Sequence, residues 1–171
     1  PVFKEINRLL KGDFSDPRVV YEHSEEHNVF GSSRVFESLP LFAGRATLEG
    51  LYMQASITAP FVFYLQSEVS AAKSAPFPQY TYTSMNFERA LPHLRLFNAG
   101  DLILRSDGAK RAIRGVTGYR LKETVGDYEW WEVTANSGRY VEPLAFEPVL
   151  FPAGRWKTDS YRWFMDERQL E

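Results

Sequence analysis

The feature that most constrains the fold is an alternation of short apolar and amphipathic segments between residues 101 and 134. Its apolar runs have strand length, and Val125-Gly126-Asp127 favours a tight hairpin between two of them. The expected elements are a strand over 101–105, a helix over 107–115 capped by Asp107, and strands over 119–124 and 128–134. A strand, a helix and a hairpin in this order predict an α+β fold with a small mixed or antiparallel sheet and helices packed against it.

The remaining segments predict further helices and short strands around this unit. Pro92 lies inside one apolar stripe, so we expect that helix to be broken into two pieces. The predicted elements are a helix over 3–10, strands over 18–21 and 34–39, a polar loop over 22–33, helices over 46–56 and 61–72, an ordered aromatic loop over 74–82, a helix over 85–96 capped by Thr83 or Ser84, and short or edge strands within 136–154.

Length and composition favour one domain spanning residues 1–171. The net charge of −2 and the pI of about 6.0 argue against nucleic acid as a partner, because phosphate binding needs a clustered basic surface. The chain has no cysteine, which excludes disulfides, thiolate metal sites and cysteine nucleophiles. Its longest strongly apolar run, 59–65, is far shorter than the ~20 residues that cross a bilayer.

One motif suggests metal chemistry. His23-Ser24-Glu25-Glu26-His27 matches the H-x-x-E-H pattern of inverted zinc peptidases, in which two histidines on one helical face bind zinc and the glutamate is the base. Here the motif follows a strand-like run and precedes Gly31-Ser32-Ser33, so a solvated polar loop is the simpler interpretation. Because no nucleophile elbow or phosphate loop is present either, we predict no cofactor, no metal and no catalytic residue.

Charged and polar residues are spaced along the otherwise apolar segment 34–68. Such groups must be paired, solvated or functional, because burial of a lone charge is costly. One interpretation is structural, with ion pairs Arg34/Glu37 and Arg45/Glu49; the other is a carboxylate-and-aromatic surface for sugar hydroxyls, with tryptophans 130, 131, 156 and 163 as stacking platforms. The candidate ligand-binding residues are Arg34, Glu37, Arg45, Glu49, Tyr52, Gln54, Gln66 and Glu68.

The segments 31–54, 60–68, 76–80 and 98–105 resemble a family of multi-pass membrane proteins. These proteins are described as "6-pyruvoyl-tetrahydropterin synthase related" and look like GT-C type membrane glycosyltransferases. The resemblance implies a domain on the extracytoplasmic face of the cytoplasmic membrane, periplasmic or at the cell surface, attached to its own transmembrane region. It also implies a parent that handles a lipid-linked sugar or a glycan acceptor. No residue here matches the catalytic acid of that class.

Three functional hypotheses follow. The first is a soluble, non-catalytic extracytoplasmic domain, excised from a larger membrane protein, whose 34–68 stretch lines the membrane-facing surface and supports sugar recognition. The second is a scaffold module that docks a partner of a cell-envelope assembly, which exposed Phe77, Tyr80 and Tyr82 would favour. The third is the zinc peptidase. The first residue is Pro1 rather than Met, which also leads us to expect a longer parent.

Overall fold

The computed structural model describes residues 1–50, 56–148, 150, 152 and 154–170. Its strands are β1 (Arg18–Tyr21), β2 (Ala99–Leu104), β3 (Tyr119–Val125) and β4 (Tyr128–Val133). Its helices are α1 (Val2–Leu9), α2 (Leu39–Phe42), α3 (Ala59–Val69), α4 (Phe87–Leu96), α5 (Asp107–Ile113) and α6 (Trp156–Met165), with 3₁₀ turns η1 (Glu25–Phe30), η2 (Val35–Ser38) and η4 (Glu167–Gln169).

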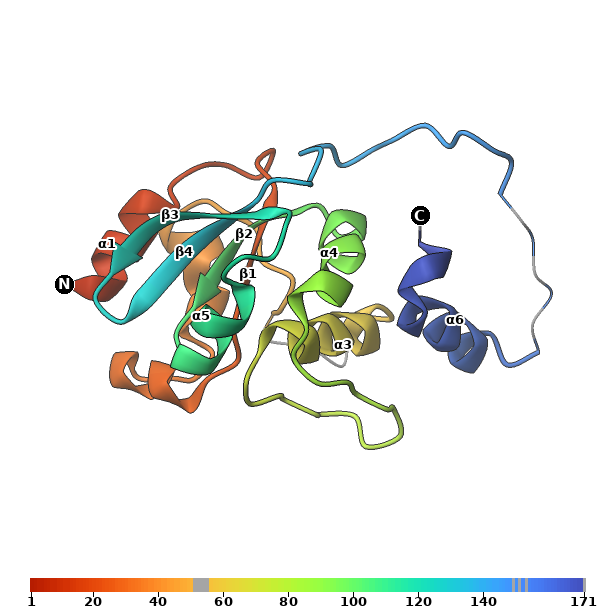
Figure 1. The fold of residues 1–171 in the computed structure, drawn as a ribbon, viewed down its shortest axis with the longest axis horizontal. Coiled ribbons are helices and arrows are strands. Elements are labelled where there is room, and N and C mark those ends of the chain that lie inside the picture. The colour runs from red at the N-terminus through yellow and green to blue at the C-terminus, as the bar shows by residue number, and fades with distance from the viewer. Residues whose placement is uncertain (51–55, 149, 151, 153, 171) are drawn as a thin grey trace.

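The strands form a mixed sheet in the order β1-β2-β4-β3 (Figure 1). β1 is parallel to β2, whereas β2/β4 and β3/β4 are antiparallel. The hairpin between β3 and β4 turns at Gly126, whose φ of 58° suits a residue without a side chain. The predicted α+β class, the strand–helix–hairpin unit and the packed helices are therefore confirmed.

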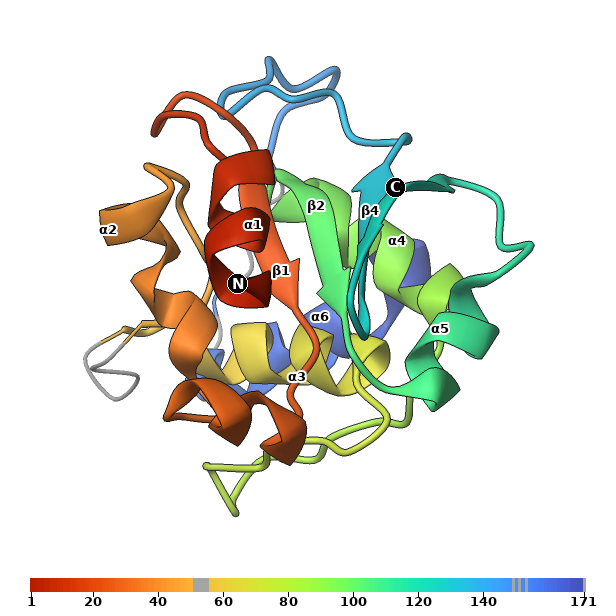
Figure 2. The same ribbon diagram turned by 90° about the vertical axis from the view of Figure 1, so that its left-hand side faces the viewer.

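Both faces of the sheet are covered, because neighbouring side chains on each strand point to opposite sides. Leu102, Trp131 and Val133 join the core formed with α3, α4 and α5, while Ile103 and Tyr128 join the core formed with α1, η2 and α2. Figure 2 shows α1 lying in front of β1 on the second of these faces. The sheet is therefore the middle layer of the domain.

Two predicted elements of the N-terminal half are wrong. The strand expected over 34–39 is instead η2 followed by α2, because Pro40 occupies the first turn of α2, where its fixed φ suits a helix. The helix expected over 46–56 is absent from residues 46–50, which run beside β1: Val19 N donates to Ala46 O over 2.9 Å, and Val19 bridges Thr47. Residues 46–50 thereby give edge strand β1 a backbone partner on its free side. Residues 51–55 of the predicted helix lie outside the described residues.

Two capping predictions and one break are also corrected. α4 is continuous through Pro92, which leaves the Glu88 carbonyl without a helical donor at an exposed position where water can bond to it. Its cap is Asn86, whose side chain accepts from Arg89 N, rather than Thr83 or Ser84. The cap of α5 is Ser106 rather than Asp107.

The short or edge strands predicted within 136–154 are wrong for the residues that the structure describes there. Residues 136–148, 150, 152 and 154 contain no strand.

The C-terminal helix α6 packs against α3 through a small aromatic core. Tyr161 and Phe164 are buried beside Tyr64, and Tyr161 Oη donates to Thr81 O over 2.7 Å in the aromatic loop. In Figure 1 a long connection leaves β4 and returns α6 to the side of α3. No helix among the described residues has the length and apolar character needed to cross a bilayer.

Candidate functional site

Four of the predicted site residues come together with a tyrosine that the sequence did not single out. Glu37 lies in η2, and Arg34 directly precedes this turn. Glu49 belongs to residues 46–50, which run beside β1. Gln66 lies in α3, and Tyr21 is the last residue of β1. Arg34 Nε donates to Glu37 Oε1, and Gln66 Nε2 donates to Glu49 Oε1. We call these five residues the polar cluster.

Burial shifts the ionisation of the acidic groups in the polar cluster. Burial, reinforced by the nearby charge of Glu37, raises the pKa of Glu49 to about 8. The pKa of Tyr21 is also raised, first by burial and then by the charges of Glu49 and Glu37. Glu49 is therefore mostly protonated at neutral pH and can both donate and accept a hydrogen bond.

Two oxygens of the polar cluster are buried without a hydrogen-bond partner among the described residues. They are Glu37 Oε2, on a side chain that is 4% exposed, and Gln66 Oε1, on a residue that is 1% exposed. The buried Tyr21 hydroxyl lies against Glu49, and its hydrogen bond partly offsets the rise in the Glu49 pKa. A cavity of about 10 Å³ touches Tyr21, Glu49 and Gln66, and the rest of its lining is apolar: Val19, Val20, Leu48, Val62 and Leu65. Such orphaned acceptors are rare in folded proteins and call for a ligand, a water or an ion.

The other predicted site residues lie elsewhere. Arg45 does not pair with Glu49. Its Nη2 donates to Asp101 Oδ2 of β2 over 2.6 Å, in a nearly buried ion pair, and to Pro17 O just before β1. Its Nη1 donates to Leu10 O just after α1. Glu68 pairs with His93. Tyr52 and Gln54 lie outside the described residues. The predicted Arg34/Glu37 pair is present.

The histidine motif does not form a metal site. His27 is fully buried in a 3₁₀ turn, and both ring nitrogens are engaged: Nε2 lies 2.7 Å from Glu22 O and Nδ1 3.1 Å from Tyr128 Oη. Among the residues that the structure describes, no group of three or more potential His, Cys, Asp or Glu ligands is found. The segment 25–30 is therefore an ordered turn and not the solvated loop or the zinc helix.

Glu22 was not singled out by the sequence, yet it organises the ends of the parallel strands. The side chain is fully buried directly after β1, and its carboxylate accepts from Arg105 N and Ser106 N, both over 2.8 Å, and from Ser106 Oγ over 2.5 Å. These donors lie directly after β2, at the start of α5. Buried carboxylates with this many donors are held firmly, so Glu22 has a structural role.

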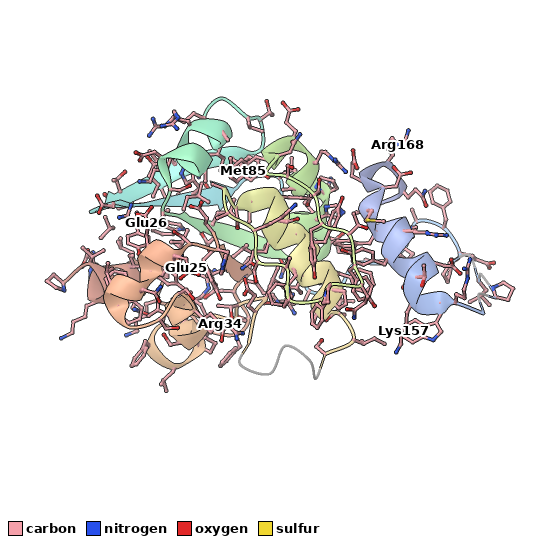
Figure 3. The ribbon with its side chains drawn as sticks, turned by 90° about the horizontal axis from the view of Figure 1, so that it is seen from below. Glu25, Glu26, Arg34, Met85, Lys157 and Arg168 are labelled. Carbon is pink, nitrogen blue, oxygen red and sulfur yellow. The ribbon has the colours of Figure 1, made fainter. Side chains whose placement is uncertain are left out.

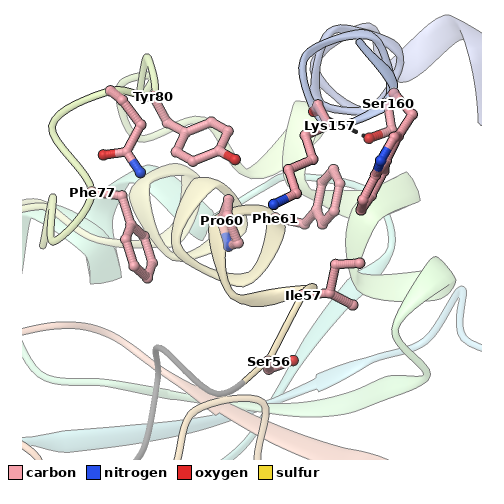
Figure 4. Close-up of a pocket in the computed structure, with 10 residues that line it drawn as sticks. Ser56, Ile57, Pro60, Phe61, Phe77, Tyr80, Lys157 and Ser160 are labelled. Carbon is pink, nitrogen blue, oxygen red and sulfur yellow. Dashed lines mark hydrogen bonds between the residues drawn. The ribbon is translucent and has the colours of Figure 1, made fainter. Parts of the chain in front are cut away.

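A separate, larger hollow of about 420 Å³ lies between the start of α3, the aromatic loop and α6 (Figure 4). We call it the aromatic pocket. Four aromatic side chains contribute to its wall: Phe61, Phe77, Tyr80 and Trp156. In Figure 3 Arg34 of the polar cluster and Lys157 of the pocket lie on opposite sides of α3.

The polar edge of the aromatic pocket is sparse. It includes Gln79, Ser160 and Lys157, the one charged side chain among the described lining residues. Figure 4 shows the Lys157 ammonium pointing into the hollow beside the Phe61 ring. Of the eight predicted ligand-binding residues, the six that the structure describes do not line this pocket. Trp156, predicted as a stacking platform, and Phe77 and Tyr80, named as possible docking residues, do. The pocket brings together Phe61 of α3 and Trp156 of α6, which are almost 100 residues apart in the sequence. The hydrophobic periodicity of either helix alone cannot predict this contact.

The fold and these two sites define a mixed-sheet α+β domain with an aromatic-walled hollow beside its C-terminal helix. The chain belongs to the family described as "Domain of unknown function (DUF8559)", whose model matches residues 2–149. Comparison with curated proteins gave no match, and comparison with solved structures gave none either. The family match therefore covers the sheet, the polar cluster and α3, whereas α6 follows it.

Proposed function

We propose that this domain is a non-catalytic extracytoplasmic module of a membrane glycosyltransferase-like protein. In this proposal the aromatic pocket holds part of a glycan acceptor or of a lipid-linked sugar during glycan assembly. The partners are the parent's own transmembrane region and that sugar ligand, and the domain lies on the outer face of the cytoplasmic membrane. The single observation that carries the proposal is the aromatic pocket.

The dimensions and chemistry of the pocket suit a sugar. Ligand sites of about 300–1,000 Å³ with mainly apolar and aromatic walls and few polar groups are typical of small-molecule recognition. The pocket has a volume of about 420 Å³ and four aromatic rings. The apolar faces of a sugar ring stack on such rings, while Gln79, Ser160 and Lys157 offer hydrogen bonds to its hydroxyl groups.

The same lining favours recognition over bond making. Glycosyl transfer and hydrolysis need a positioned acid or base, commonly a carboxylate. Among the described residues that line the aromatic pocket there is no Asp, Glu or His. Any bond-making group would therefore come from another part of the parent protein.

Isothermal titration calorimetry with a panel of oligosaccharides and soluble lipid-linked sugar analogues tests the proposal. Trp156 is 48% exposed on the pocket wall, so its fluorescence provides a second signal for the same titration. We expect saturable binding that Phe61→Ala weakens at least ~10-fold, since a lost stacking partner costs about 1.5 kcal/mol or more. Phe14→Ala, which removes a ring 66% exposed outside the pocket, is the matched control. Absence of binding across the panel, or equal loss in both variants, would refute the proposal.

A second function, docking of a partner in an envelope assembly, is favoured by a different observation. The connection between β4 and α6 exposes large apolar side chains that most domains would cover: Val141 (84%), Leu144 (73%), Phe146 (86%) and Leu150 (90%). If this connection docks a protein, replacing all four by serine will abolish chemical cross-linking to a co-expressed envelope partner and leave glycan binding unchanged. Cross-linking that survives the replacement would exclude it.

A further inference from the structure

We propose that the sugar held in the aromatic pocket carries one carboxylate, as a uronic acid does, and that Lys157 binds this carboxylate. The proposal rests on the function proposed above and names the chemical class of its ligand. It follows from three observations: the placement of the Lys157 ammonium, the absence of a competing carboxylate among the described lining residues, and the charge that one lysine neutralises.

The first observation is the placement of the ammonium group. Lys157 lies in the first turn of α6, and Figure 4 shows its Nζ in the hollow beside the Phe61 ring. Nζ also lies 5.6 Å from the centre of the Trp156 ring, a distance at which a cation is attracted to an aromatic face. The aromatic wall therefore keeps the three N–H donors of the ammonium at the pocket, where a ligand can accept from them.

The second observation is that no carboxylate of the described chain competes for this ammonium. The ion pairs of the C-terminal segment, within the part that the structure describes, are Arg89–Glu167 and Arg168–Asp166, and neither includes Lys157. The described lining of the pocket contains no Asp or Glu. An anion in the hollow therefore meets one positive charge and no opposing negative charge, between walls of low polarity that strengthen the attraction.

The third observation is the charge count. One lysine balances one negative charge, which is the charge of a carboxylate. A phosphate monoester carries about −1.5 to −2 at neutral pH, so a single lysine leaves part of its charge uncompensated. Phosphate sites commonly use the forked guanidinium of arginine as well, and the described lining residues include no arginine. The charge count therefore favours a carboxylate over a phosphate.

The sugar ring and its carboxylate are recognised together in this proposal. The apolar face of the ring stacks on the aromatic wall, while the carboxylate at the edge of the ring accepts a hydrogen bond from Lys157 Nζ. Hydrogen bonds between two charged groups are about twice as strong as neutral ones. An acidic sugar should therefore bind more tightly than the neutral sugar of the same shape.

Isothermal titration calorimetry with matched oligosaccharides tests the proposal. They are arranged in sets of three that differ only at C6 of the terminal ring, which carries a hydroxymethyl group, a carboxylate or a phosphate ester. We expect the carboxylate member of a set that binds to be about 10-fold tighter than the hydroxymethyl member, and tighter than the phosphate member as well.

The outcomes separate this proposal from the proposed function. If the carboxylate and hydroxymethyl members bind equally in every set, the carboxylate assignment fails and the proposed function stands. Tighter binding of the phosphate member would overturn the charge count and with it the carboxylate. If no member of any set binds, the proposed function itself fails, and this proposal fails with it.

Variants of two matched lysines assign the preference to one residue. Lys157→Met keeps the length of the side chain but removes its charge, so the ratio of the carboxylate to the hydroxymethyl affinity should fall from about 10 to about 1. Lys122 is the control, because its Nζ lies 5.5 Å from the centre of the Trp130 ring, outside the pocket. Lys122→Met should keep the ratio. A ratio retained in Lys157→Met, or lost equally in both variants, would contradict the assignment.

A measurement on the wild-type protein alone covers the case in which a variant fails to fold. Lys157 is exposed, so salt should screen its attraction to a carboxylate. Between about 0.02 and 0.5 M sodium chloride we expect the affinity for the carboxylate member to fall roughly three-fold or more and that for the hydroxymethyl member to stay constant. An equal response of the two sugars to salt would overturn the proposal.

Discussion

His93 Nδ1 lies 2.7 Å from Glu68 Oε2, and both side chains are completely buried between α3 and α4. The other ring nitrogen, Nε2, lies 2.7 Å from Phe164 O and must donate to it, because a carbonyl only accepts. Nδ1 and the carboxyl group therefore share one proton, in either a neutral or an ion-pair arrangement. The hydrogen bond from His93 Nε2 to Phe164 O connects α6 to the domain core.

Removing one partner of this pair should be costly. His93→Ala leaves Glu68 buried without a partner and is expected to lower the free energy of unfolding by about 3–5 kcal/mol. Glu68→Gln should cost only about 1 kcal/mol, since its amide can donate to Nδ1. Urea denaturation measures both. A His93→Ala loss no larger than that of Glu68→Gln would disprove this account.

The pH dependence of stability should carry a component from Glu49. Its pKa is about 8 in the folded protein and 4.5 as the ordinary value, so the folded state binds more protons between these limits. The contribution is complete below pH 4.5 and is lost as the pH rises through 8, with a slope of at most about 1.4 kcal/mol per pH unit. Urea denaturation from pH 5 to 9 should show a flatter profile for Glu49→Gln than for the wild-type protein. Parallel profiles would be inconsistent with the raised pKa.

Arg45 should matter for stability and not for ligand binding. Its ion pair with Asp101 is nearly buried, and Asp101 Oδ1 also accepts from Trp130 Nε1 over 2.7 Å. Arg45→Ala leaves that carboxylate without its cation, with an expected loss of about 3 kcal/mol. The exposed pair Arg8–Glu5 provides a control, since Arg8→Ala should leave the free energy of unfolding nearly unchanged. Chemical denaturation and sugar titration of both variants distinguish the two roles.

The aromatic pocket should depend on the docking of α6. Phe164 is 1% exposed and packs on Phe61 and Tyr64, so Phe164→Ala is expected to cost about 3 kcal/mol and to weaken any sugar binding in the pocket. Trp163→Ala on the same helix removes a side chain of similar size that is 44% exposed, and it should leave both properties nearly unchanged. Equal effects in the two variants would argue against an ordered α6.

Two glycines should respond to alanine in opposite directions. Gly44 has φ of +71°, and an added Cβ would lie 2.4 Å from Gly12 O, so Gly44→Ala should destabilise the protein by 2 kcal/mol or more, about the cost of a strained backbone. Gly108 lies in α5, where a Cβ would make an ordinary 3.5 Å contact with Ala71. Gly108→Ala should be neutral or stabilise by up to about 1 kcal/mol. Thermal melts of the two variants compare them directly.

The sequence by itself determined the elements whose signals are local. The unit from β2 to β4 was predictable because its strands, helix and hairpin turn depend on residues near one another, including Gly126 in the tight turn. Ion pairing within a single turn, as in Arg34/Glu37, is local in the same way. The α+β class followed from these elements.

The tertiary structure alone decided which distant groups meet. The extended path of residues 46–50 depends on the free edge of β1, Arg45 finds Asp101 on another strand, and Tyr21 joins the polar cluster from the end of β1. The aromatic pocket likewise joins Phe61 of α3 to Trp156 of α6. The local periodicity of a segment shows which face of a helix or strand is apolar. Which other element packs against that face depends on strand order and helix packing. These bring together side chains that are far apart in the sequence.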